Sequence, residues 1–192
     1  MMMNNRLVLG IAAIIGSCFV TEVDGAEVQV RIAAVIPNEL YQEATHFDDI
    51  ALLELAEPLT WSEAIQPGNF PTVDDENPTA TNCKTAGWGE VEAGSGVSSP
   101  VLLGTDLTLM ADSDCRDIYL GTGLIGSSMI CAASETNSVP CGVGDDGAPL
   151  MCGDDNQIVG IYSWSEGCGE GFPPVFTQIS QFLTWIDEIA NA

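Results

Sequence analysis

Short apolar or alternating runs, bounded by Gly, Pro, Asn and Asp, recur along the chain from residue 28 onward. Such runs are typical of β-strands, because successive side chains of a strand point to opposite faces and turn residues end the strand. We expect strands over 28–36, 50–55, 101–110, 128–131, 157–164 and 174–177. Their shortness and spacing indicate an all-β sandwich or barrel.

Two helices are expected to interrupt this pattern. The first covers residues 113–119, and Asp112 could cap its first turn. The second begins at Ser180 and carries apolar side chains at i, i+3, i+4 and i+7. These side chains are Phe182, Trp185, Ile186 and Ile189. They form one stripe, which we expect to dock on the adjoining barrel.

The N-terminal residues 1–25 differ from the rest of the chain. Arg6 is followed by an almost wholly apolar run from Leu7 to Val20 and then by small and polar residues. This order predicts a secretory signal peptide, because the apolar run is short for a membrane span of about 20 residues. Two alternatives are a buried N-terminal helix and a lipid anchor at Cys18. We expect residues 26–192 to be a secreted, extracellular domain.

The cysteine count fits export. Cys18 lies in the expected leader, which leaves six of the seven cysteines. They are Cys83, Cys115, Cys131, Cys141, Cys152 and Cys168. In an oxidising compartment six cysteines predict three disulfides, with fifteen possible connectivities. A zinc site is not expected, because the chain has one histidine and no Cys-x-x-Cys pair.

The net charge of −24 limits the partners. Nucleic acid and anionic membrane surfaces would be repelled. The acids are scattered singly and in pairs, without the ligand spacing of a calcium loop, and indicate a solvated acidic surface. Beyond the expected leader the basic residues are Arg31, Lys84 and Arg116. A protease that cuts after Lys or Arg would therefore find few sites.

Six motifs stand in an order that is known from one family. They are DIALLEL at 49–55, Cys-x-x-Ala-Gly-Trp-Gly at 83–89, MICA at 129–132, GDDGAPL at 144–150, Ser-Trp at 163–164 and PVFT at 174–177. On these residues the chain resembles the chymotrypsin/trypsin-like serine proteases over about residues 28–192. The resemblance implies an all-β double barrel with an incomplete first barrel and a C-terminal amphipathic helix.

The resemblance also implies the organisation of the domain. Residues 26–67 would be the remnant of the first barrel, 68–82 the linker, and 83–192 the second barrel with the C-terminal helix. The family's disulfides, carried onto the matching cysteines, are Cys83–Cys152, Cys115–Cys131 and Cys141–Cys168. The strands that the first barrel lacks would leave open sheet edges.

The catalytic residues depart from the family. The resemblance makes Asp49 the triad's acid and puts Asp146 where the nucleophilic serine should stand. A carboxylate is ionised at neutral pH, so it has no proton for a base to take, and it opposes a developing oxyanion. The family's histidine segment is absent, and His46 stands too near Asp49 in sequence to replace it. We interpret His46 as an exposed loop histidine.

Activation and substrate binding are altered as well. In the family a freed N-terminus pairs with the aspartate that corresponds to Asp145, but no matching N-terminal motif occurs here. Gly144 follows one extra residue, and Ala148 replaces a glycine, so the oxyanion loop is in doubt. The resemblance implies that Ser163, Trp164, Gly144 and Asp145 are remnants of the family's substrate cleft, with Ser163 and Trp164 on the strand edge that lines it.

These residues predict a secreted, non-catalytic serine protease homologue that needs no metal or other cofactor. It would bind a protease, a protease inhibitor or a peptide, and it would not bind nucleic acid, nor a membrane unless Cys18 is lipidated. The alternative is a trypsin-like serine endopeptidase whose sequence is truncated or misassembled.

Overall fold

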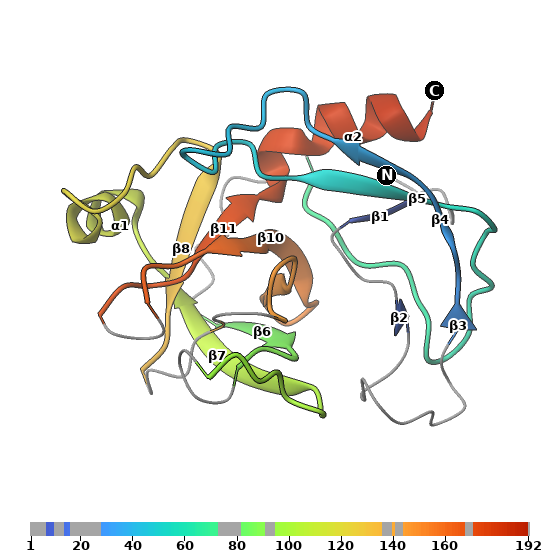
Figure 1. The fold of residues 1–192 in the computed structure, drawn as a ribbon, viewed down its shortest axis with the longest axis horizontal. Helices are drawn as coiled ribbons and strands as arrows, with labels where there is room; N and C mark the ends of the chain where they lie inside the picture. The colour runs from blue at the N-terminus through green and yellow to red at the C-terminus, as the bar shows by residue number, and fades with distance from the viewer. Residues whose placement is uncertain are drawn as a thin grey trace.

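The computed structural model describes residues 7–9, 14–15, 28–72, 82–90, 95–135, 140, 144–167 and 171–191. Within these residues the chain forms a closed six-stranded barrel, a three-stranded sheet and a pair of two-residue strands. The C-terminal helix lies along the three-stranded sheet, and the barrel lies beside them (Figure 1). The fold is mostly β, with one closed barrel and a separate open sheet of three strands.

The closed barrel is built from residues 83–178. Its strands are β6 (Cys83–Gly87), β7 (Leu103–Leu109), β8 (Met129–Ala133), β9 (Pro149–Cys152), β10 (Gln157–Trp164) and β11 (Val175–Gln178). All neighbours are antiparallel, in the closed order β10-β11-β8-β7-β6-β9. Their inward side chains, among them Leu107, Leu150 and Phe176, form the barrel core. Closure therefore gives every strand of this barrel two neighbours.

The three-stranded sheet has the order β1-β5-β4. It consists of β1 (Leu7–Leu9), β5 (Ala51–Leu55) and β4 (Ile32–Pro37), while β2 (Ile14–Ile15) pairs with β3 (Val28–Gln29). The single strand expected over 28–36 is thus divided into β3 and β4. The strands β1 and β2 fall inside the expected signal peptide. The signal peptide stays a prediction. In the full-length chain, which includes residues 1–25, β1 pairs with β5.

The first helix, α1 (Asp112–Ile118), begins one residue earlier than expected. The prediction that Asp112 caps it was wrong, because Ala111 holds the N-cap position and no side chain caps the helix there. Asp112 instead lies in the first turn, 3.6 Å from Arg116 one turn later. That position suits an acid, since the amino end of a helix carries partial positive charge.

The C-terminal helix joins the two parts of the fold. A 3-10 turn, η1 (Ile179–Phe182), leads into α2 (Leu183–Ala190). Its expected stripe packs into one cluster with Ile50 and Leu52 of the sheet region and Ile161 of β10. None of the helices in the described part of the chain is long and apolar enough to cross a membrane.

Two of the implied disulfides are present, Cys83–Cys152 and Cys115–Cys131. The first joins directly opposite residues of β6 and β9, and the second joins α1 to β8. Cys141 and Cys168 lie outside the described residues. Both bridges that are seen therefore staple the closed barrel.

The expected linker, 68–82, is described only at 68–72 and 82. Its first residues are docked on the barrel, because the Ile158 N–H donates to the Asn69 carbonyl oxygen at 2.7 Å. Phe70 packs beside α2, and Pro71 is buried. Residues 68–71 therefore lie against β10.

Candidate active-site cleft

Asp49 is held between the sheet region and the barrel. It stands two residues before β5, and its Oδ2 accepts a 2.6 Å hydrogen bond from the Ser163 hydroxyl of β10. Its backbone oxygen accepts a 2.7 Å bond from the Thr177 hydroxyl of β11. Both bonds come from barrel strands, so they fix the carboxylate against the barrel. Asp49 and Ser163, which the motifs singled out separately, are therefore brought together.

The loop before Asp49 turns sharply. His46 and Asp48 have φ angles of 55° and 54°, in the left-handed region that non-glycine residues seldom adopt. Gln42 and Phe47 form an isolated bridge that closes the loop. Phe47 then packs against a barrel cluster that includes Tyr119. These contacts hold the loop on the barrel.

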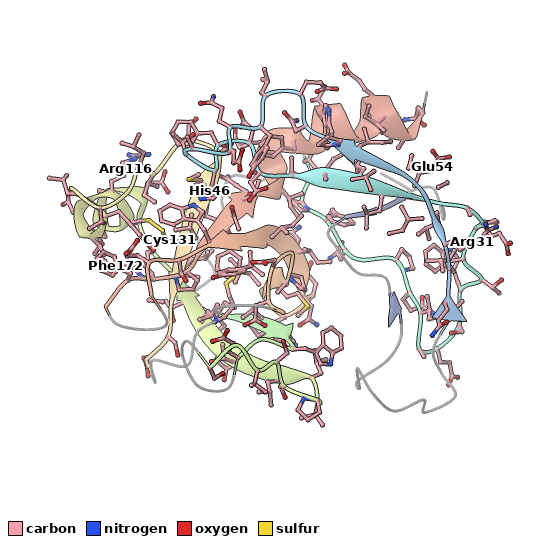
Figure 2. All side chains as sticks on the ribbon, in the orientation of Figure 1. Arg31, His46, Glu54, Arg116, Cys131 and Phe172 are labelled. Carbon is pink, nitrogen blue, oxygen red and sulfur yellow. A yellow bond between two sulfur atoms is a disulfide. The ribbon has the colours of Figure 1, made fainter. Side chains whose placement is uncertain are left out.

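The interpretation of His46 as an exposed loop residue was wrong. His46 is half-buried, and its ring stacks on the Trp164 indole with centroids 5.8 Å apart and an interplanar angle of 27°. Figure 2 shows His46 beside β8, near Cys131, on the barrel side of the molecule. The sole histidine of the chain thus stacks on an aromatic side chain of β10.

Trp164 is packed on several sides. Tyr119 meets it edge-on at 4.9 Å, and Gly123 lies so close that an added Cβ would stand 2.7 Å from the indole ring. Tyr119 is fully buried and donates a 2.6 Å bond to the Pro173 carbonyl oxygen. Burial is the main reason that the pKa of Tyr119 is raised to about 12. Tyr119 therefore stays protonated and fixes the Trp164 side of the cleft.

The turn that carries Asp146 is closed by its own backbone. Gly144 and Gly147 have φ angles of 111° and 81°, which a glycine adopts without strain. The Ala148 N–H donates to the Asp145 carbonyl at 2.9 Å, and the Gly147 N–H donates to the Tyr162 carbonyl at 3.1 Å. The alanine in place of the family glycine is accommodated, because Ala148 has no positive φ angle.

Asp146 stands exposed on this turn. Partial desolvation of its carboxyl group, and then the negative charge of Asp49, raise the pKa of Asp146. Asp49 is thus close enough to Asp146 for its negative charge to disfavour ionisation of the Asp146 carboxyl group.

Asp145 points away from Asp146 into the barrel wall. Its side chain is 8 % exposed, and its Oδ1 accepts a 2.9 Å bond from the Gly89 N–H. A Cβ at either Gly87 or Gly89 would overlap the carboxylate. The two glycines of the Gly-Trp-Gly motif therefore make room for this buried acid.

The end of β10 offers an open backbone edge. The register of β10 with β11 runs as far as Trp164, whereas its register with β9 ends at Ile161. Among the described residues Trp164 is thus paired in strands on one side only, and Ser163 lies at a register shift between β10 and β11. An extended peptide could add to such an edge through main-chain hydrogen bonds.

Sequence reasoning missed three residues that build this cleft. Thr177 belongs to the PVFT motif, but only the fold brings its hydroxyl to Asp49. Tyr119 and His46 were interpreted by position in the chain, whereas their contacts with Trp164 join distant segments. The aromatic character of these residues is the one sequence signal that could have suggested packing.

Comparisons with known proteins agree with this architecture. A family model described as Trypsin matches residues 4–186. The chain is 31 % identical over 163 residues to transmembrane protease serine 5 of Homo sapiens, covering 83 % of this chain and 36 % of that protein. It is also 31 % identical over 163 residues to trypsin 5G1 of Aedes aegypti, covering 84 % and 60 %. Serine protease 56 of Homo sapiens is 31 % identical over 170 residues, covering 85 % and 28 %.

A solved structure shares the fold. The structure of neuropsin, a serine protease expressed in the limbic system of mouse brain, superposes with a TM-score of 0.86 at 25 % identity. The match covers 98 % of this chain and 86 % of that one. The chain spans between 28 % and 60 % of the length of the three curated relatives. Since the family model covers nearly the whole chain, the chain belongs to the trypsin family of chymotrypsin/trypsin-like serine proteases.

Proposed function

We propose that this chain is a catalytically inactive member of the trypsin family that binds a protein or peptide partner. The observation that carries the proposal is Asp146, an exposed carboxyl group that stands where the family's motif has its nucleophilic serine. In the family's mechanism a serine hydroxyl loses its proton to a histidine and attacks the carbonyl carbon. A carboxylate at that position offers no hydroxyl, and its charge opposes the oxyanion that attack creates.

The missing base supports the same proposal. The chain has one histidine, His46, whose ring stacks on Trp164. In such triads the loss of the nucleophile or of the base alone lowers turnover by about 10⁶-fold. Asp49 keeps its bond from Ser163 but has no imidazole to orient. We therefore expect peptide hydrolysis at least about 10⁶-fold slower than that of a family member with an intact triad.

The open end of β10 supports the binding part of the proposal. Strand addition supplies main-chain hydrogen bonds without any catalytic residue. Trp164 offers a rigid apolar ring beside this edge, because Tyr119 and His46 hold it. The partners that such a surface suits are a protease, a protease inhibitor or an extended peptide.

The test of inactivity is hydrolysis of trypsin-, chymotrypsin- and elastase-type peptide substrates by the purified protein with its disulfides intact. We expect no turnover by wild type or by Asp146→Ser, because a serine without a base remains unactivated. Turnover by wild type that is lost in Asp146→Asn would contradict the proposal.

The test of binding is capture of partners from the native fluid, with identification by mass spectrometry and titration of each purified partner. Trp164→Ala should weaken a partner that uses the β10 edge by at least about tenfold, as truncating a central aromatic contact often does. Trp164→Phe should retain most of the affinity. Val97→Ala, at a site 67 % exposed outside the cleft, is the matched control. Equal affinity of all variants would exclude the β10 edge.

A serine endopeptidase remains the second candidate because the geometry of its acid is intact. Asp49 still receives bonds from Ser163 and Thr177, although this chain has no histidine for it to orient. The related proteins are named as proteases. A transcript that encodes both a histidine segment and a serine at position 146 would favour this candidate.

We also propose that the chain is exported, with 1–25 as its leader and 26–192 as the mature domain. The two disulfides support an oxidising compartment. Sequencing the N-terminus of the native protein should find a start near residue 26. A native protein that begins with the apolar run would instead retain β1 in the sheet and contradict the leader.

A further inference from the structure

The basic residues of the chain are few and unusually placed. The whole sequence holds 4 Lys and Arg against 28 Asp and Glu. Beyond residue 31 the basic residues are Lys84 and Arg116 alone. Lys84 lies in a strand and Arg116 in a helix, so none of the segments that connect these elements after residue 38 contains a Lys or Arg.

Lys84 lies in the most constrained part of the barrel. It is a residue of β6, and it is paired with Asp106 of β7 on one side and Met151 of β9 on the other. The neighbouring Cys83 is bridged to Cys152. A protease needs several residues around the scissile bond in an extended, free segment, and exposed loop tips meet that need where paired strands do not. The peptide bond after Lys84 is thus shielded unless the barrel opens.

Arg116 lies within α1, next to the bridged Cys115. Its side chain pairs with Asp112, and the turn that follows is anchored by the fully buried Tyr119. Arg31 precedes β4, and its carbonyl oxygen accepts a 2.8 Å bond from the Ala56 N–H. Figure 2 shows Arg116 and Arg31 at opposite sides of the molecule, one on α1 and one beside the sheet.

The apolar residues follow a different pattern. Leu40, Tyr41, Trp61, Leu120 and Leu124 are all exposed and lie outside the helices and strands, with Leu120 78 % exposed. A protease that cuts after large apolar residues therefore finds candidate bonds in three connecting segments. The placement of residues therefore protects the native chain from proteases that cut after Lys or Arg, and not from those that cut after large apolar residues.

We propose that this domain is built to persist alongside an active protease that cuts after Lys or Arg. This inference rests on the proposed binding function and narrows the class of partner. A protease that cuts after Lys or Arg could bind the chain without degrading it. Of the three positions, Arg31 beside the open sheet is the least protected. The peptide bond after Arg31 should be the first to be cut after long exposure to the protease.

The test is digestion of the native, disulfide-intact protein by trypsin and, separately, by chymotrypsin, matched for activity on an unfolded substrate. We expect the half-life in trypsin to be at least about tenfold longer, since exposed loops are the preferred sites of cleavage. The reduced, unfolded chain should be cut by trypsin after each basic residue. Equal half-lives of the native protein in the two proteases would overturn the proposal.

A variant pair separates the residue pattern from the general stability of the fold. Leu120→Arg puts a basic residue in an exposed turn, and Leu120→Gln is the matched control without charge. Leu120→Arg should shorten the half-life in trypsin at least about tenfold, and Leu120→Gln should leave it unchanged. An unchanged half-life of Leu120→Arg would show that the fold alone protects the chain, which contradicts the proposal. The peptide-hydrolysis and binding tests do not depend on this outcome, so the two proposals can fail separately.

Discussion

The six-stranded barrel and the three-stranded sheet differ in whether their strands leave unpaired backbone edges. Each barrel strand has two neighbours, and two disulfides staple the barrel. The sheet leaves β4 with one neighbour, and Val35 on that strand is 60 % exposed. An open, apolar edge invites pairing with another chain. The incomplete barrel therefore needs local features that discourage such pairing.

The β4 edge has two such features. Pro37, its last residue, has no N–H to donate. The register with β5 shifts between Ile32 and Ala34, which distorts the strand. The end of β10 at Ser163 and Trp164 also has a register shift, but it has no proline. The comparison teaches that the β10 end keeps the backbone N–H donors that strand addition needs, whereas β4 lacks one at Pro37.

The largest expected effect comes from opening the barrel staple. Replacing Cys83 and Cys152 with alanine removes a bridge that spans 69 residues. On the chain-entropy model this costs about 4 kcal/mol of unfolding free energy, against about 3 kcal/mol for the shorter Cys115–Cys131 loop. Denaturant unfolding of both double variants measures the difference. A smaller loss from the Cys83–Cys152 pair would contradict the ordering.

A slightly smaller effect is expected where the sheet meets the barrel. Leu52 of β5 is fully buried in the cluster that joins α2 and Ile161. Leu52→Ala should cost about 3 kcal/mol, by lost burial and the cavity that remains. One shared unfolding transition, followed by tryptophan fluorescence and far-ultraviolet circular dichroism, should shift as a whole. If only part of the signal shifts, the two regions unfold independently.

The smallest effect concerns the cleft carboxylates. Because the folded-state pKa of Asp146 is raised, its ionisation costs stability as pH rises through its titration, and that cost is absent at acid pH, where the group is protonated in both states. Asp146→Asn should therefore raise Tm slightly at pH 7 and leave it nearly unchanged near pH 3. Solvent screening keeps the effect small. A lower Tm of Asp146→Asn at pH 7 would contradict the raised pKa of Asp146.

The sequence predicted the elements whose side chains alternate or form a stripe. The strand at 157–164 was confirmed, and its four central residues are buried in succession, as its continuous apolar run suggests. The apolar stripe of the C-terminal helix was confirmed because that face packs into the cluster with the sheet and β10. The strands β6 and β9 were not predicted from pattern, since Cys83–Gly87 and Pro149–Cys152 contain small residues or proline and lack a clear apolar run. Their place in the barrel depends on neighbours far away in the chain.

The cleft was predictable only in part. The motifs identified Asp49, Ser163 and Trp164, because each stands in a segment that the family shares. The stacking of His46 on Trp164 could not be predicted, since it depends on a loop with two left-handed residues and on the docking of that loop on the barrel. The position of Ala111 at the cap of α1 was missed because an aspartate next to it gave the stronger local signal.

The most direct test of inactivity is labelling of the native protein with a serine-directed phosphonate, followed by intact-mass measurement. Asp146 offers no hydroxyl to phosphonylate, and no histidine activates another serine in the cleft. The account predicts an unchanged mass after an exposure that fully labels trypsin. A single phosphonyl adduct per chain, abolished by prior denaturation, would contradict it.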